Sequence, residues 1–252
     1  MDTINSALRI RDVDKMYQIS VWRRIDLRER YNLPLAGSGV AKLDGIVQNI
    51  YEAAVEDSIL QPFKDENLSI PLKNEEFKKA FWDRSETESV TDSTPLKIFG
   101  PADIYFIDFK EDFVFDRQHS QIKFDIKYIS LVMDSEVNMP KAANDSTSGV
   151  IPREKVVAYF RYNDFINHFK KHPTARWINF KNRSENKTYP EAFQRRDFRS
   201  VITKFTNEND FTVFDLVNKK IGDPEKKKFQ AYLDALAFEY KLLDFENSLW
   251  EW

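Results

Sequence analysis

The pattern of apolar and polar residues predicts strands in the middle of the chain. Residues 121–128 read Gln-Ile-Lys-Phe-Asp-Ile-Lys-Tyr, and this strict alternation is the period of a strand with one buried face. The apolar stretch 104–109 is predicted to form a neighbouring strand, and residues 116–120 the hairpin connection. Residues 156–160 read as a strand that returns to the same sheet. The region 96–160 is therefore expected to be mainly strands.

Before this region the spacing is mainly helical. Apolar residues recur every three positions across 12–30, which predicts a helix, or a helix followed by a short strand: Met16, Ile19, Trp22 and Ile25. A second set follows one helix face and predicts a helix over 41–58: Leu43, Ile46, Val47, Ile50 and Ala54. The polar stretch 85–95 reads as a loop. Residues 1–82 are thus expected to be mainly helical.

Residues 161–252 are also predicted to be mainly helical. Thr188 and Glu191 have the spacing of a capping box, with Pro190 inside the first turn. Behind them, helical spacing continues through Phe198, Val201, Ile202 and Phe205.

The last helix carries two apolar stripes. The first has the spacing 4, 3, 4, 3: Phe229, Leu233, Leu236, Tyr240 and Leu243. The second contains Leu242, Phe245 and Leu249. We expect the first stripe to dock onto the core. The second stripe, with Trp250 and Trp252, is expected either to close over the N-terminal helix or to offer a surface to a partner.

These elements together predict one α+β domain over residues 1–252. Its antiparallel sheet is expected to be flanked by helices, with helical segments at the N-terminal and C-terminal ends. Composition supports a packed core, because 42% of the 252 residues are hydrophobic and 21 are Phe.

The net charge and the absence of cysteine exclude several classes of function. A net charge of −3 supplies no global attraction for nucleic acid or an anionic membrane. The chain has no cysteine, which excludes disulfides, thiolate catalysis and Cys-ligated zinc and suits an oxidising compartment such as a periplasm. No apolar run approaches the roughly 20 residues of a membrane helix. Residues 1–10 lack the apolar region of a signal peptide, so we expect a leader to have been removed from a periplasmic protein.

Candidate catalytic chemistry is sparse. His168 and His172 stand four residues apart, and Asp164 could add a third metal ligand, but two solvated histidines are the simpler interpretation. No phosphate-binding loop or nucleophile motif occurs. We therefore predict no catalytic, cofactor or metal site. The alternative is an envelope carbohydrate-active hydrolase that uses two carboxylates of the Asp108–Asp116 cluster, although a solvated acidic turn explains that cluster as well.

A charged segment near the N-terminus is a candidate partner-binding surface. Charges alternate in sign through residues 23–30, and exposed ion pairs contribute only about 0–1 kcal/mol each. We therefore expect the charges of this segment to serve contacts between subunits more than stability. The predicted partner-binding residues are Arg24, Asp26, Arg28, Glu29, Trp250 and Trp252.

Several segments resemble the GldN/PorN family. Residues 22–35, WRRIDLRERYNLPL, are similar to its R-x-I-D-L-R-E-K-x-N-x-P-L stretch, and residues 112–120, DFVFDRQHS, to its D-W-x-F-D-K-x-x-S strand and turn. The end of the chain, YLDAL followed by FENSLWEW, resembles its G-L-D-A-L and F-E-H-D-L-W-E-Y terminus. The sequence FQRRDF at 193–198 is similar to F-x-K-R-x-F. These matches occur in the family's order and cover nearly the whole chain.

The resemblance implies a non-catalytic structural subunit in the periplasm. A family member is expected to form a ring with the GldK/PorK lipoprotein beneath the outer membrane, which entails self-association. That ring lies near the GldL/GldM motor proteins of the type IX secretion and gliding machinery. No catalytic residue or cofactor follows from the resemblance.

Overall fold

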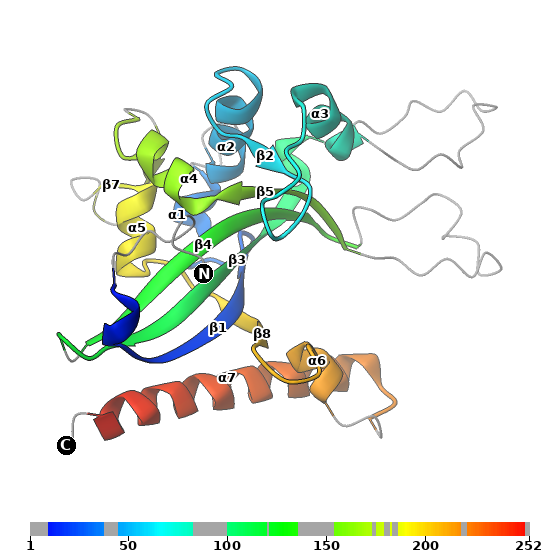
Figure 1. The fold of residues 1–252 in the computed structure, drawn as a ribbon. Coiled ribbons are helices and arrows are strands. Elements are labelled where there is room, and N and C mark those ends of the chain that lie inside the picture. Colours follow the sequence, from blue (N-terminus) through cyan, green and yellow to red (C-terminus); the bar gives the residue numbers. More distant parts are fainter. Residues whose placement is uncertain are drawn as a thin grey trace. The chain divides into compact units, whose positions relative to one another are not determined.

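The structure is a computed structural model, and it describes residues 10–37, 45–82, 100–119, 121–135, 154–172, 175–178, 182, 186–217 and 221–249. The described residues form an α+β fold with a six-stranded antiparallel sheet in the order β2-β5-β4-β3-β1-β8 (Figure 1). The predicted fold class is therefore confirmed. A separate two-stranded sheet pairs β6 (Arg176–Trp177) with β7 (Lys187–Thr188).

Two compact units divide the chain, and each is built from segments that are distant in sequence. The first unit comprises Met1–Ile25, Asp108–Tyr128 and Ser200–Trp252, and the second comprises Asp26–Ile107 and Ile129–Arg199. The two longest strands, β3 (Ile104–Asp116) and β4 (Gln121–Met133), contribute residues to both units. The alternating segment predicted as a strand is confirmed within β4.

In the first unit, β1 (Lys15–Asp26) follows a short 3-10 helix, η1 (Asp12–Asp14). A single helix over 12–30 is therefore wrong, whereas the alternative of a helix followed by a strand matches the order of η1 and β1, although the strand is the longer of the two. Burial alternates at the end of the strand, where Val21, Arg23 and Ile25 are buried. The charged Arg23 thus occupies a core position. It interrupts the alternation of apolar and polar residues that is typical of a strand, so the remaining apolar residues show the three-residue spacing of a helix.

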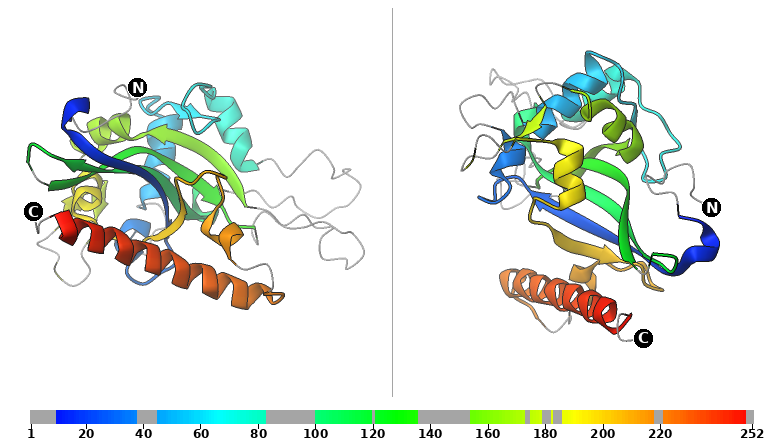
Figure 2. Two further views of the ribbon diagram at one scale, coloured as in Figure 1. Left: turned by 60° about the horizontal axis from the view of Figure 1, so that its bottom comes forward. Right: turned by 90° about the vertical axis from the view of Figure 1, so that its left-hand side faces the viewer.

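Strand β1 pairs antiparallel with β8 (Val201–Phe205), and the register shifts between Trp22 and Arg23. The helical spacing read through 198–205 was misleading, because residues 201–205 form an edge strand. After β8 come α6 (Val213–Leu216) and the 26-residue helix α7 (Pro224–Leu249), which runs beside β8 (Figure 2).

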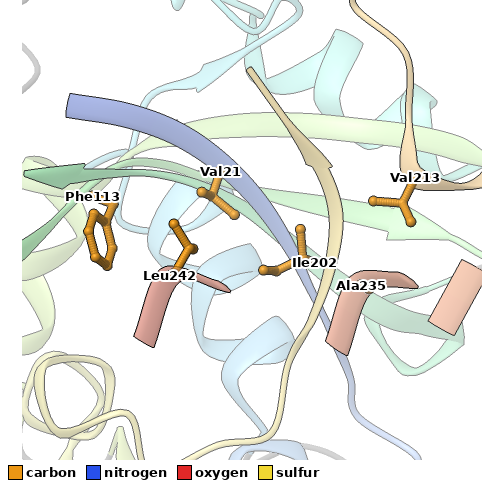
Figure 3. Close-up of a cluster of buried hydrophobic side chains, with 6 residues drawn as sticks. All are labelled: Val21, Phe113, Ile202, Val213, Ala235 and Leu242. Atoms are coloured by element: carbon orange, nitrogen blue, oxygen red, sulfur yellow. The ribbon is translucent and has the colours of Figure 1, made fainter. Parts of the chain in front are cut away.

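One cluster of buried side chains joins these elements (Figure 3). Strands β1, β3 and β8, together with α6 and α7, supply its members: Val21, Phe113, Ile202, Val213, Ala235 and Leu242. Around it, the ring of Phe238 stacks on that of Phe205 with centroids 4.0 Å apart.

Helix α7 docks through a different face from the apolar stripe that was predicted to dock. Ala235 and Leu242 are buried, whereas Leu233, Tyr240 and Leu243 of the first stripe are exposed. The expectation that the first stripe docks onto the core is therefore wrong. The small side chains of Ala231 and Ala235 let the helix approach the sheet, and a search for large apolar residues overlooks such positions. Trp250 and Trp252 lie outside the described residues.

The second unit is mainly helical around an aromatic core. It contains β2 (Pro62–Phe63), β5 (Lys155–Arg161), the 3-10 helix η3 (Pro101–Asp103), and the helices α1 (Leu33–Ala36), α2 (Ile46–Val55), α3 (Asn74–Trp82), α4 (Tyr162–Phe169) and α5 (Tyr189–Arg195). The predicted helix over 41–58 is confirmed between 46 and 55. The capping box is also confirmed, because the Glu191 amide donates to Thr188 Oγ1 at 3.3 Å and the Thr188 amide to Glu191 Oε2 at 2.8 Å.

Candidate functional site

The charged segment does not form one continuous surface. Arg23 is only 5% exposed, and its Nε donates to Glu111 Oε1 at 2.7 Å. Its Nη1 donates to Glu239 Oε1 at 2.8 Å, so the guanidinium joins β1 to β3 and α7. Because a buried ion pair constrains the fold, Arg23 has a structural role and not the contact role that the alternation of charges suggested.

Arg24, the next residue, lies on the opposite face of β1. Its Nε and Nη2 donate to the two oxygens of Asp108 at 2.7 and 2.9 Å, and both side chains are 23% exposed. A bidentate pair of this kind fixes the geometry of both groups. Arg24 is therefore accessible at the surface of the first unit, but in a fixed orientation.

Asp26, Arg28 and Glu29 belong to the second unit. Arg28 donates to Asp26 at 2.9 Å and to Asp134 at 2.9 Å, and its guanidinium lies 4.8 Å from the centre of the Phe106 ring. The Arg28 side chain is 44% exposed. Glu29 lies 3.7 Å from Arg199. Asp26 and Arg28 thus lie together on a surface with an accessible cation.

A buried asparagine anchors this segment, and the sequence analysis missed it. Asn32 is 0% exposed, donates to the carbonyls of Asp26 and Arg199, and accepts from the Arg199 amide at 2.7 Å. A single Asn in a polar stretch has no signal that distinguishes a buried clamp from a turn residue. Its contacts hold the backbone that presents Arg28.

A hollow in the second unit borders Arg28. It has a volume of about 220 Å³, and its apolar lining includes Leu27, Leu33, Ile46 and Tyr105. Leu33 is 40% exposed. The hollow places an apolar recess next to an accessible cation, a combination suited to binding a side chain of a partner protein.

The carboxylates of the hydrolase alternative are held by hydrogen bonds and ion pairs. Asp112 accepts from Gln18 Nε2 at 2.7 Å and from Ser20 Oγ at 2.6 Å, and is only 5% exposed. Asp116, 2% exposed, lies 2.6 Å from Lys123 Nζ. The interpretation as a solvated acidic turn is therefore wrong for Asp112 and Asp116, because both carboxylates are buried and hydrogen-bonded.

The electrostatics of Asp116 do not suit a general acid. Hydrogen bonds from Lys123 and His119 hold the pKa of the Asp116 carboxyl well below its ordinary value. A glycosidase acid requires a raised pKa, so that it holds a proton at neutral pH. The Asp116 carboxyl is consequently ionised at neutral pH, and its pairs with Lys123 and His119 hold the hairpin.

His168 and His172 are not the solvated pair that the sequence predicted. Their ring centroids are 5.2 Å apart, and His168 Nε2 is buried without a hydrogen-bond partner among the described residues. His172 Nδ1 accepts from the Ala175 amide at 3.1 Å. Asp164 lies 3.9 Å from Arg161, and no cluster of three potential metal ligands occurs in the described parts of the chain.

Stability is expected to fall in mild acid because of His168. Burial, followed by repulsion from His172, lowers the pKa of His168 below 6.5, while Asp57 opposes the shift. A base with a lowered pKa is neutral when folded, so its contribution to stability is present above pH 6.5 and is lost as the pH falls below it.

Urea unfolding at pH 7.5 and pH 5.0 measures this contribution. The loss of unfolding free energy between the two pH values should be smaller in His168→Gln than in the wild type. Equal losses in the two proteins would show that His168 does not contribute to the acid sensitivity.

Comparison with known proteins decides the family. The model of the family described as gliding motility associated protein GldN matches residues 10–251, which is nearly the whole chain. The chain belongs to the GldN family. It is therefore a component of the gliding-motility and type IX secretion machinery. A comparison with curated proteins found no match.

The family match agrees with the resemblance found from the sequence motifs, and its range includes every predicted partner-binding residue except Trp252. None of the described helices is long and apolar enough to cross a membrane. The described candidate residues Arg24, Asp26, Arg28 and Glu29 are all held by ion pairs.

Proposed function

We propose that this GldN-family chain is a non-catalytic structural subunit of a periplasmic ring in the type IX secretion and gliding machinery. It assembles with a GldK/PorK-like outer-membrane lipoprotein and with further copies of itself, near GldL/GldM-like motor proteins. The family match over residues 10–251 carries the proposal. The buried ion pairs of Arg23 with Glu111 and of Lys123 with Asp116 support a structural role, because they join elements of the first unit.

Arg28 is the best candidate for a contact with a partner in this assembly. Its side chain is 44% exposed, it borders the apolar hollow of the second unit, and Asp26 and Asp134 orient it. Charge reversal at Arg28 would set a new carboxylate beside two others and perturb the fold. Arg28→Gln removes the charge with less disturbance and is therefore the sharper variant.

Arg28→Gln is expected to change the free energy of unfolding by only about 0–1 kcal/mol, because its ion pairs are partly exposed. Binding to the purified lipoprotein should weaken roughly tenfold, since a rim cation that orients a partner is lost. Urea unfolding measures the first effect, and surface-immobilised lipoprotein measures the second.

The matched control is Lys78→Gln, which removes an exposed ion pair with Glu75 on α3. This variant should bind the lipoprotein as the wild type does. The assignment of Arg28 would be wrong if Arg28→Gln were strongly destabilised yet bound normally. The proposed function itself would fail if the wild-type chain did not co-purify with the lipoprotein from the envelope of its native host.

A further inference from the structure

Helix α7 has an apolar face that the described residues leave uncovered. Ala235, Phe238 and Leu242 face the core of the first unit. On the opposite side of the helix, four large apolar side chains are 40–65% exposed, and the half-buried Leu236 lies among them. We call this surface the α7 seam, and it consists of Phe229, Leu233, Leu236, Tyr240 and Leu243. An exposed apolar stripe of this size on a water-facing helix indicates a binding surface.

The spacing of the α7 seam indicates what can bind there. Its residues recur at intervals of 4, 3, 4 and 3, which is the repeat by which one α-helix packs against another. At a rise of 1.5 Å per residue, the stripe is about 21 Å long. An extended strand has a different period, so a helix is the element that matches the seam along its length.

Charges beside the α7 seam indicate the chemistry of the partner helix. Asp244 and Glu246 flank the seam near its C-terminal end, whereas the lysines at 226–228 are confined to the first turn. Glu239 is already paired with Arg23 of β1. Because opposite charges that flank such a seam favour pairing, the complementary partner carries basic side chains beside its own apolar stripe.

We propose that the α7 seam is the docking surface for an amphipathic helix of another protein. That helix has one apolar stripe, and Lys or Arg flank the stripe where it meets Asp244 and Glu246. The inference rests on the proposed function, because a subunit of an assembly must bind other proteins. It adds the surface involved and the chemistry of the partner.

Two synthetic peptides of roughly three heptads test the surface with the full chain. Both carry Leu at the a and d positions and a fluorescent label, but one has Lys at e and g and the other Glu. Fluorescence polarisation should show saturable binding of the basic peptide. The acidic peptide should bind about tenfold more weakly or not at all.

Three variants locate the binding. The double variant Leu233→Ser/Tyr240→Ser should raise the Kd for the basic peptide about tenfold. The control Val13→Ser removes an apolar side chain that is 80% exposed outside the seam, and it should bind as the wild type does. The double variant Asp244→Lys/Glu246→Lys should reverse the preference between the two peptides. Circular dichroism establishes that each variant retains its helix content.

Equal binding of the two peptides, or binding that the seam variant leaves intact, overturns the inference. Analytical ultracentrifugation tests whether a second copy of the chain binds the α7 seam instead. A dimer of the wild type that Leu233→Ser/Tyr240→Ser dissociates would assign the seam to a second copy, and so also overturn it. Co-purification with the lipoprotein is a separate measurement, so its failure removes the proposed function without changing the peptide result.

Discussion

Arg23→Ala is expected to lower the free energy of unfolding by about 3–5 kcal/mol, because it leaves a buried charge without its partner. Glu111 is 1% exposed and accepts from Arg23 Nε at 2.7 Å. The same guanidinium donates to Glu239 on α7. Removal of the guanidinium therefore leaves the Glu111 carboxylate buried without its partner. It also removes a contact between the sheet and the longest helix.

Arg24→Ala is the matched control for this prediction. It is the same substitution at the next residue of β1, but the pair with Asp108 is partly exposed, so the expected loss is about 1 kcal/mol or less. Urea unfolding of both variants gives the comparison. A loss at position 23 no larger than that at position 24 would show that the buried pair does not stabilise the first unit.

Phe165→Ala should destabilise the protein by about 3–5 kcal/mol, because it opens a cavity in the aromatic core of the second unit. Phe165 is 0% exposed, and its ring centroid lies 4.8 Å from that of Phe169 and 5.7 Å from that of Phe193. Neighbouring rings of this size cannot collapse fully into the space that one phenyl group leaves. Urea unfolding measures the loss.

The comparison variant is Phe229→Ala on the α7 seam, where the side chain is 63% exposed. The same chemical change is expected to alter stability by only about 0.5 kcal/mol. A large loss at Phe229 would place that ring in a packed core and would also contradict the free surface assigned to α7. A small loss at Phe165 would contradict the packing of the second unit.

Local rules were sufficient where a local interaction decides the structure. The alternation over 121–128 predicted its strand, because successive side chains of a strand point to opposite faces. Thr188 and Glu191 predicted a helix start, since their reciprocal hydrogen bonds involve residues only three apart. The absence of cysteine excluded disulfides and thiolate chemistry, whatever the fold. The ordered motifs also indicated the family that the comparison then showed.

The remaining features depend on residues far apart in sequence. The full length of strand β1 was not predicted, because Arg23 occupies a core position that is tolerated only when Glu111, 88 residues later, neutralises it. The docked face of α7 was misassigned because two alanines pack against the sheet. The pattern of apolar residues along the sequence does not reveal the shape of that sheet. The charged residues Arg24 and Arg28 were singled out by the sequence pattern, but their distant partners, Asp108 and Asp134, are brought close only by the fold.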